Sequence, residues 1–169
     1  LFDDEGVFST RTHVIDKGTL VAGLSDLQSA LALGAAPTGN GRREAFDHKA
    51  YARMTNTYFA PGSSRLGDLV GAVKNGWLLE KMDSGMEDPK NWGIQLVVSL
   101  AREIRDGKLT GRVAGPVVCS GYVPDVLSAI DMVSSDFALS GSGYCGKGHK
   151  EFVKVSAGGP YLKTRMRLG

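Results

Sequence analysis

Short apolar runs separated by turn residues predict two β-hairpins in this chain. Residues 14–20 and residues 102–109 each place a glycine, Gly18 or Gly107, between apolar flanks. Glycine supplies the positive φ that a tight hairpin turn needs, and the Asp-Gly pair of the second turn is a strong hairpin signal. An apolar run at residues 94–100 leads into the second hairpin and predicts a buried strand. Because hairpins join antiparallel neighbours, these segments favour an antiparallel sheet.

Apolar residues at helical spacing predict three short helices. The first begins at the capping box of residues 25–28 and is stopped by Gly34. The second begins near Ser64 and is stopped by Gly76, and the third opens with Pro124, which suits a first turn. The apolar residues in helical register are Ala30, Leu31, Leu66, Leu69, Val70, Val73, Val126, Leu127 and Ile130. Short helices laid on an antiparallel sheet make an α+β fold in which β structure dominates.

The remaining segments, residues 34–53, 60–64 and 81–91, carry no hydrophobic period and are predicted as loops. No internal repeat, low-complexity tract or domain boundary interrupts the sequence. We therefore expect residues 1–169 to form a single domain. Because the chain starts with leucine rather than methionine, we expect it to be part of a longer protein.

Composition narrows the possible functions. The 169 residues are 42% hydrophobic and 22% charged, as in an ordinary folded protein. Glycine is over-represented, with 23 of the 169 residues against an average usage of roughly 7%, and this excess favours many turns and short strands. A formal charge of +2 gives no argument for nucleic-acid binding, and no apolar run reaches the roughly 18 residues of a membrane span. Two cysteines make no disulfide framework, so we expect a reducing, cytoplasmic compartment.

Cys145 is the first candidate for chemistry. It lies in a glycine-rich stretch, residues 141–148, which predicts a tight turn that presents the sulfur, and Lys147 follows two residues later. A thiolate is a strong zinc ligand, and a nearby lysine favours the thiolate. A zinc site needs three or four protein ligands, however, and a lone cysteine is commonly a small buried hydrophobe. On the residues alone, the second interpretation is favoured.

The chain shows no complete metal or nucleophile site of its own. His13, His48 and His149 form no H-E-x-x-H pair, and glycines separate His149 from Cys145, which disfavours helical geometry there. No serine stands in a G-x-S-x-G motif. Cys119 follows an apolar run and is predicted to be a buried strand cysteine.

The Gly-Asn-Gly-Arg-Arg segment, residues 39–43, has the makings of an anion cradle, with backbone amides and two arginines. No P-loop lysine follows it, so a structural turn is the favoured interpretation.

Several blocks, in the same order along the chain, resemble the C-terminal domain of TldD/PmbA metallopeptidases. The Thr-Gly-Asn-Gly-Arg-Arg block is most typical of the TldD branch. Each block alone is weak, whereas their shared order across nearly the whole chain is strong. The blocks are residues 3–7, matching the family's opening strand, 38–43, 53–58 with 61–62, 103–108, 145–148, and 158–160 at the start of the terminal strand.

The resemblance implies a strand-rich domain joined to an N-terminal domain, absent from this chain, that carries an H-E-x-x-x-H helix. In the family, two histidines of that helix and the cysteine matched by Cys145 hold zinc, and the helix glutamate acts as general base. The implied reaction is hydrolysis of peptide bonds in extended or unfolded peptides, with no catalytic residue and no activity in these 169 residues alone. Members form dimers, with themselves or with a paralogue. Asn56 and Tyr58 are candidates for hydrogen bonding to the substrate backbone, and a structural role in their loop is the equally open alternative.

Two alternatives stay open. The first is a non-catalytic peptide-binding or assembly domain that uses its sheet edges, which the absence of an upstream H-E-x-x-x-H motif would support. The second is an independent small-molecule binding domain, which predicts a ligand pocket enclosed within these residues.

Overall fold

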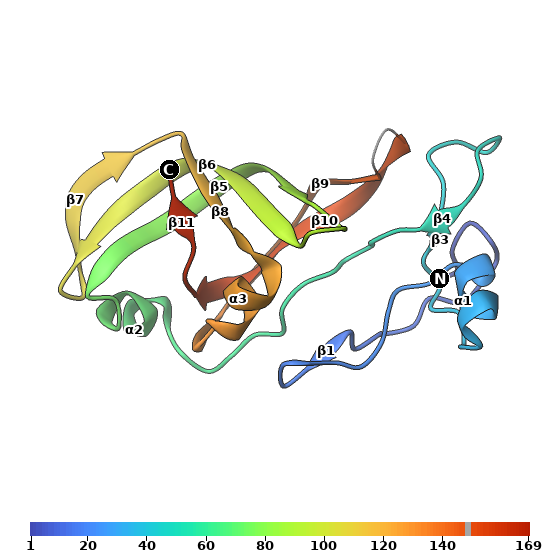
Figure 1. The fold of residues 1–169 in the computed structure, drawn as a ribbon, viewed down its shortest axis with the longest axis horizontal. Helices are drawn as coiled ribbons and strands as arrows, with labels where there is room; N and C mark the ends of the chain where they lie inside the picture. The colour runs from blue at the N-terminus through green and yellow to red at the C-terminus, as the bar shows by residue number, and fades with distance from the viewer. Residues whose placement is uncertain (148–149) are drawn as a thin grey trace. The chain divides into compact units, whose positions relative to one another are not determined.

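The computed structural model describes residues 1–147 and 150–169, and strands dominate it (Figure 1). Contacts between residues divide the chain into two compact units. Unit 1 comprises residues 1–59 and 138–159, and unit 2 comprises residues 60–137 and 160–169. The chain thus passes between the units three times, which is why no single linker marks the division in the sequence. That residues 1–169 act as one domain of a longer protein stays a prediction.

Unit 1 contains small elements and most of one long ribbon. The elements are β1 (Ile15–Asp16), β2 (Thr19–Leu20), α1 (Leu27–Leu33), β3 (Gly41–Arg42) and β4 (Tyr51–Ala52). The ribbon consists of β9 (Met132–Lys147) and β10 (Lys150–Lys163), which pair with each other and have residues in both units.

Unit 2 is built on a five-stranded sheet whose central strand is β6. Its strands and helices are α2 (Leu66–Gly71), β5 (Asn75–Glu87), β6 (Gly93–Arg105), β7 (Lys108–Ala114), β8 (Val117–Tyr122), α3 (Val123–Ser128) and β11 (Arg167–Leu168). Antiparallel β5 follows β6 along its length on one side, while β8 and then β7 share the other side, and β11 pairs with β8 (Figure 1). The sheet confirms the predicted antiparallel, β-dominant α+β fold.

The buried residues of unit 2 lie mainly on β6 and its neighbour β8. Ala101, Ile104 and Cys119 are each no more than 2% exposed, and Leu69 of α2 is buried with them. The apolar run at residues 94–100 is confirmed as a strand, but only Val98 within it is fully buried, so the sheet is covered less completely than the run suggested.

Both predicted hairpins are confirmed, and their turns have the expected backbone. Lys17 and Gly18 have φ values of 48° and 84°, and Asp106 and Gly107 have φ values of 46° and 75°. The second turn also anchors the sheet to the segment that follows α2, because the Gly107 amide donates to the Val73 carbonyl over 2.9 Å.

The three helices form where they were predicted, with different ends. Helix α1 is capped by Asp26 and Ser29 rather than by the box at residues 25–28, and Gly34 stops it with φ of 62°. Helix α2 ends at Gly71, so the predicted stop at Gly76 is wrong; that glycine lies in β5. Residues 123–128 form α3 with proline in the first turn, and Ile130 lies beyond it.

Several predicted loops are strands. Residues 34–53 contain β3 and β4, and most of residues 81–91 belong to β5. The β5 segment was missed because its second half is exposed and polar, carries a register shift between Met82 and Ser84, and so lacks a simple alternation. Residues 158–160 lie inside β10 rather than at the start of a strand.

We expect the close approach between Gly107 and α2 to make that glycine irreplaceable. A β-carbon there would lie 2.7 Å from the Gly71 carbonyl oxygen, whereas one at Gly111, which also has positive φ, would meet nothing within 4 Å. Gly111→Ala should cost about 1 kcal/mol of unfolding free energy through backbone strain alone, and Gly107→Ala about 2–3 kcal/mol. Urea unfolding measures both; equal costs would contradict the packing argument.

Candidate functional site

Cys145 lies in the strand β9 and not in a turn, which corrects the sequence prediction. Its side chain is 8% exposed, and its thiol is free of any disulfide. The neighbouring glycines serve packing instead: a β-carbon at Gly143 would lie 3.0 Å from Ala157 Cβ, and one at Gly146 would lie 2.7 Å from the ring of Phe152. The predicted turn residues Gly148 and His149 lie outside the described residues.

A buried arginine holds the backbone of β9 at this position. Arg53 follows β4, is 2% exposed, and donates from Nη2 to the carbonyl oxygen of Cys145. Asn40 fixes the backbone of Arg53 in turn: its Nδ2 donates to the Arg53 carbonyl over 2.9 Å, and its own carbonyl accepts from the Arg53 amide over 2.9 Å. Because buried charge is costly unless hydrogen-bonded, this arrangement fixes Arg53 and β9 together.

The Gly-Asn-Gly-Arg-Arg segment has a structural role, but only part of it is the predicted turn: Gly39 lies in a bend with φ of 69°, whereas Gly41 and Arg42 form β3. Its amides bind carboxylates of the chain itself: Gly41 N donates to Asp3 Oδ2 over 2.8 Å, and Arg43 N donates to Asp4 Oδ2 over 2.9 Å. Residues 3–7 therefore form a turn that fills the cradle, and the opening strand implied by the resemblance is not found there.

Asp26 joins α1 to the segment that carries Arg53. Its Oδ1 accepts from the Ser29 amide over 2.7 Å, and its Oδ2 accepts from the Ala52 amide over 2.9 Å. Burial raises the pKa of this carboxyl, but the hydrogen bonds from Ser29 and Ala52 and the charge of Lys147 together hold the pKa below its ordinary value of 3.8. Asp26 is thus an ionised cap at pH 7.

The ammonium groups of two lysines lie near one tyrosine ring. The Nζ atoms of Lys49 and Lys147 lie 5.3 Å and 5.7 Å from the centroid of the Tyr51 ring. Lys147 also donates to the Ala52 carbonyl over 3.2 Å. Since residues i and i+2 of a strand share a face, Lys147 and Cys145 lie on the same face of β9.

The other predicted residues are less closely tied to Cys145. Asn56 and Tyr58 are exposed, and Tyr58 lies beside β10, where its Cβ would be 3.9 Å from a β-carbon at Gly159. His13 precedes β1, and His48 is an exposed loop residue. In the described part of the chain, no three His, Cys, Asp or Glu side chains gather into a possible metal site.

Cys119 is buried in β8, as predicted, and burial raises the pKa of its thiol. It lies among the residues that line an apolar groove of unit 2, about 660 Å³ in volume, together with Leu69, Trp77 and Ile104.

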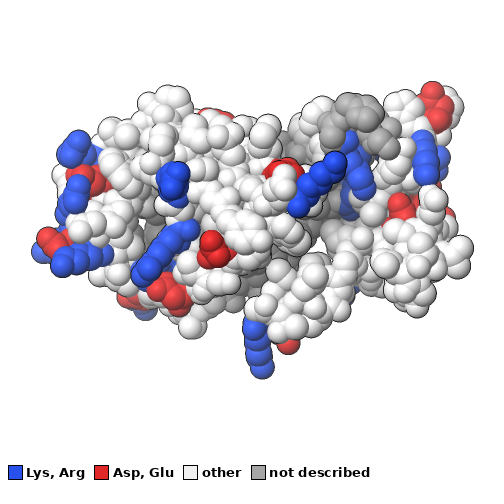
Figure 2. Space-filling view, viewed as in Figure 1, with Lys and Arg blue, Asp and Glu red and all other residues white. Residues whose placement is uncertain are grey.

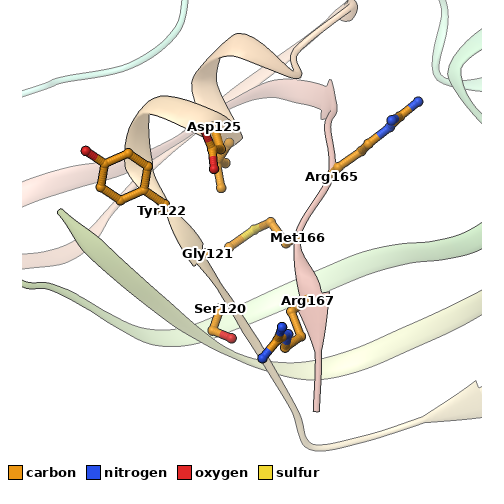
Figure 3. A pocket seen from close by; sticks show the side chains of 8 residues that line it. Ser120, Gly121, Tyr122, Asp125, Arg165, Met166 and Arg167 are labelled. Carbon is orange, nitrogen blue, oxygen red and sulfur yellow. The ribbon is translucent and has the colours of Figure 1, made fainter.

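A second hollow in unit 2, of about 460 Å³, lies between β8, α3 and β11 (Figure 3). Figure 3 shows Met166 near Gly121, with the Arg165 side chain extending away from the other labelled residues. Neither hollow contains a residue singled out for chemistry.

Charges of both signs are interspersed on the face drawn in Figure 2. None of the helices in residues 1–147 and 150–169 has the length and apolar character that a membrane crossing requires.

We expect the ionised cap to make stability depend on pH. Asp26→Asn should cost roughly 1–2 kcal/mol at pH 7, because an amide NH₂ would replace an oxygen that now accepts. A lowered pKa contributes stability above the unfolded value and loses it as pH falls through the folded value, so the difference between the wild type and the variant should shrink as the pH falls below 3.8. Urea midpoints at pH 7 and at successively lower pH test this, with the exposed Asp16→Asn as control; a constant difference would contradict it.

Comparison with known proteins now gives the family. The family model described as the PmbA/TldA metallopeptidase C-terminal domain matches residues 1–167. A zinc metalloprotease TldD homolog of Saccharolobus solfataricus is 32% identical over 164 residues, which are 97% of this chain and 36% of that protein. A metalloprotease TldD homolog of Haemophilus influenzae is 36% identical over 162 residues, 95% of this chain and 33% of that one. This chain therefore spans about a third of the length of these relatives.

Solved structures support the fold. The crystal structure of TldE from Thermococcus kodakarensis matches 99% of this chain, and 35% of its own length, with a TM-score of 0.77 and 21% identity. A structure of a putative modulator of a DNA gyrase from Thermotoga maritima matches 99% of this chain and 35% of its own, with a TM-score of 0.72 and 21% identity. With the family match over nearly every residue, the chain belongs to the PmbA/TldA metallopeptidase C-terminal domain family.

Proposed function

We propose that this chain supplies Cys145 as one zinc ligand of a TldD-like metallopeptidase that hydrolyses peptide bonds in extended or unfolded peptides. The observation that carries the proposal is the hold of Arg53 on the Cys145 carbonyl, which fixes a buried thiol at a defined place on β9. Relatives that match the chain at more than 30% identity are named metalloproteases, which supports a hydrolase as the intact protein.

The donor set of the chain fits one position of a zinc site and no more. A thiolate suits zinc, but zinc needs three or four protein ligands, and the described residues offer no cluster of three candidates. The remaining ligands, two histidines, and the general base come under this proposal from an H-E-x-x-x-H helix outside these residues. A zinc ion held there would supply Lewis-acid chemistry that lowers the pKa of a bound water, as hydrolysis of a peptide bond requires. These residues alone are inactive under this proposal.

The roles of this chain's own residues follow from their placement. Cys145 holds the metal, and Arg53 keeps its strand in position. Asn56 and Tyr58, exposed beyond β4, hydrogen-bond the backbone of an extended substrate.

The exposed apolar side chains of unit 1 support the proposal that another domain or subunit covers this unit. Apolar side chains that would normally be covered are more than two thirds exposed there: Leu1, Phe2, Phe8, Leu20, Leu31, Leu33 and Phe46. Apolar side chains left this exposed can be covered by another protein surface. We propose that the N-terminal domain of the same protein, or the second subunit of a homodimer or heterodimer, covers them, and that the protein acts in the cytoplasm.

One observation favours the alternative of a non-catalytic binding or assembly domain. Strand β5 lies at the edge of the unit 2 sheet, and Met82 and Met86 on it are 62% and 67% exposed. An edge with apolar side chains can receive another strand.

Substituting each of the two cysteines distinguishes the metallopeptidase from the non-catalytic binding domain. In the full-length protein, Cys145→Ala should lose about one zinc per chain together with hydrolysis of a casein-type peptide, because a ligand is removed. Cys119→Ala should keep both, since Cys119 is a packing residue of β8. Metal analysis and peptide hydrolysis measure the result. Full zinc and activity in Cys145→Ala would instead favour the binding domain.

Arg53 gives a second test with a readout other than activity. Arg53→Met removes the donor to the Cys145 carbonyl and should lower zinc affinity about 10- to 100-fold, as losses of supporting hydrogen bonds around metal ligands do. The thiolate charge-transfer band of the cobalt-substituted protein should weaken as well, and Arg53→Lys should restore part of both.

The matched control is Arg112→Met, which removes an exposed guanidinium in unit 2. A folded Arg53→Met protein with unchanged zinc affinity would show that Arg53 does not position the ligand.

A further inference from the structure

We propose that Lys49 and Lys147, which both contact the ring of Tyr51, form a subsite for a carboxylate of the bound peptide. The inference rests on the proposed function and deepens it, because it names the chemical group by which a substrate is recognised beside Cys145. The group is the C-terminal carboxylate of a peptide or the side chain of an acidic residue.

The first argument is the convergence of like charges. Both ammonium groups lie within 6 Å of one ring centroid, at 5.3 Å and 5.7 Å, so both gain from the electron-rich face of Tyr51. Two cations on one ring also repel each other, which opposes folding. An anion bound between them would remove that repulsion.

The second argument is that no described carboxylate neutralises them. Among the side chains that the structure describes, which leave out those of residues 148–151, no carboxylate lies within 4.0 Å of either ammonium group. Lys49 donates to Gln28 and Lys147 to the Ala52 carbonyl, which uses one of three donors in each case. Asp26 feels the charge of Lys147, but its oxygens already accept from Ser29 and Ala52.

The third argument is distance from the proposed metal ligand. Lys147 is two residues from Cys145 on the same face of β9, roughly 7 Å along the strand. An extended peptide advances by the same length over two residues. A carboxylate held by Lys147 therefore lies within one or two residues of a peptide bond presented beside Cys145, so the subsite favours cleavage close to a carboxylate.

Direct binding tests the subsite without hydrolysis. Full-length protein freed of metal by a chelator is titrated into three fluorescent peptides of one neutral sequence: the free acid, its C-terminal amide, and the amide with one internal aspartate. We expect the free acid to bind about tenfold tighter than the plain amide at low salt, and the preference to shrink in about 0.5 M salt. Tight binding of the aspartate peptide instead would identify an acidic side chain as the source of the carboxylate.

Substitutions then assign the preference. Lys147→Gln and Lys49→Gln should each weaken it and the double variant should abolish it, whereas Lys147→Arg, which keeps the charge and the ring contact, should retain it. Lys154→Gln removes an exposed lysine of β10 and should leave it unchanged. Thermal unfolding of each variant shows that the fold is intact.

Equal affinity for all three peptides, no binding of any, or a preference that survives the double substitution would overturn the inference. The subsite and the proposed function can fail separately. If the metal-loaded wild-type protein hydrolyses the free acid and the amide equally well, the peptidase function stands and the subsite is contradicted. If the wild-type protein binds the free acid but hydrolyses no peptide, the subsite stands and the peptidase function is contradicted.

Discussion

The buried guanidinium of Arg53 is the interaction on which unit 1 depends. A charge removed from water is tolerated only where hydrogen bonds replace its hydration, and removing a partner is costly because the charge is left uncompensated. Here the Cys145 carbonyl is one of its partners, and Asn40 clamps the Arg53 backbone through two hydrogen bonds. One side chain thereby ties the residue after β4 to β9, although Arg53 and Cys145 lie 92 residues apart in the sequence. The position of the candidate zinc ligand follows from this tie.

Each unit is stabilised internally by a different kind of interaction. Unit 2 has an apolar core around its central strand, with Ala101, Ile104 and Cys119 almost fully buried. In the described part of unit 1, Ala30, Cys145 and Val153 are buried, but so are the polar residues Ser25, Asp26, Asn40 and Arg53. Thr38 links Ser25 to Asn40, Asn40 holds the Arg53 backbone, and Asp26 accepts from the Ala52 amide. Polar networks contribute little net stability but allow few alternative geometries. Unit 1 is therefore suited to placing groups accurately, while its apolar side chains remain outside for a partner.

The sequence predicted the features that depend on one or two residues. Gly18, Gly107 and Gly34 each marked a backbone position with positive φ, so both hairpin turns and the end of α1 were correct. Strand β9 was missed because it carries glycines, which disfavour strands and suggested a turn. Those glycines make room for side chains of β10, a contact that exists only once the two strands pair. The candidate site was similarly only half predictable.

Cys145 was identified as a candidate ligand by the resemblance to a family, whereas the roles of Arg53 and Lys49 were identified only in the structure. Nothing local distinguishes a buried arginine from an exposed one in the sequence; the partner that buries Arg53 is 92 residues away. Lys49 lies in a polar loop segment, and only the structure shows that it contacts the same Tyr51 ring as Lys147. Long-range pairing, rather than local pattern, decides which of many polar residues belong to the site.

The placement of Cys145 in a strand also limits how the rest of a metal site can be built. A ligand in a turn can be reoriented by small backbone changes, but a paired strand fixes each side chain to one face. Cys145 shares its face with Lys147, while Gly146, on the other face, is closely approached by Phe152. Further ligands must therefore approach from the face that carries Cys145 and Lys147. A substrate bound at that metal would then pass Lys147, which the same strand presents, together with Tyr51 and Lys49, because the Tyr51 ring lies next to both ammonium groups.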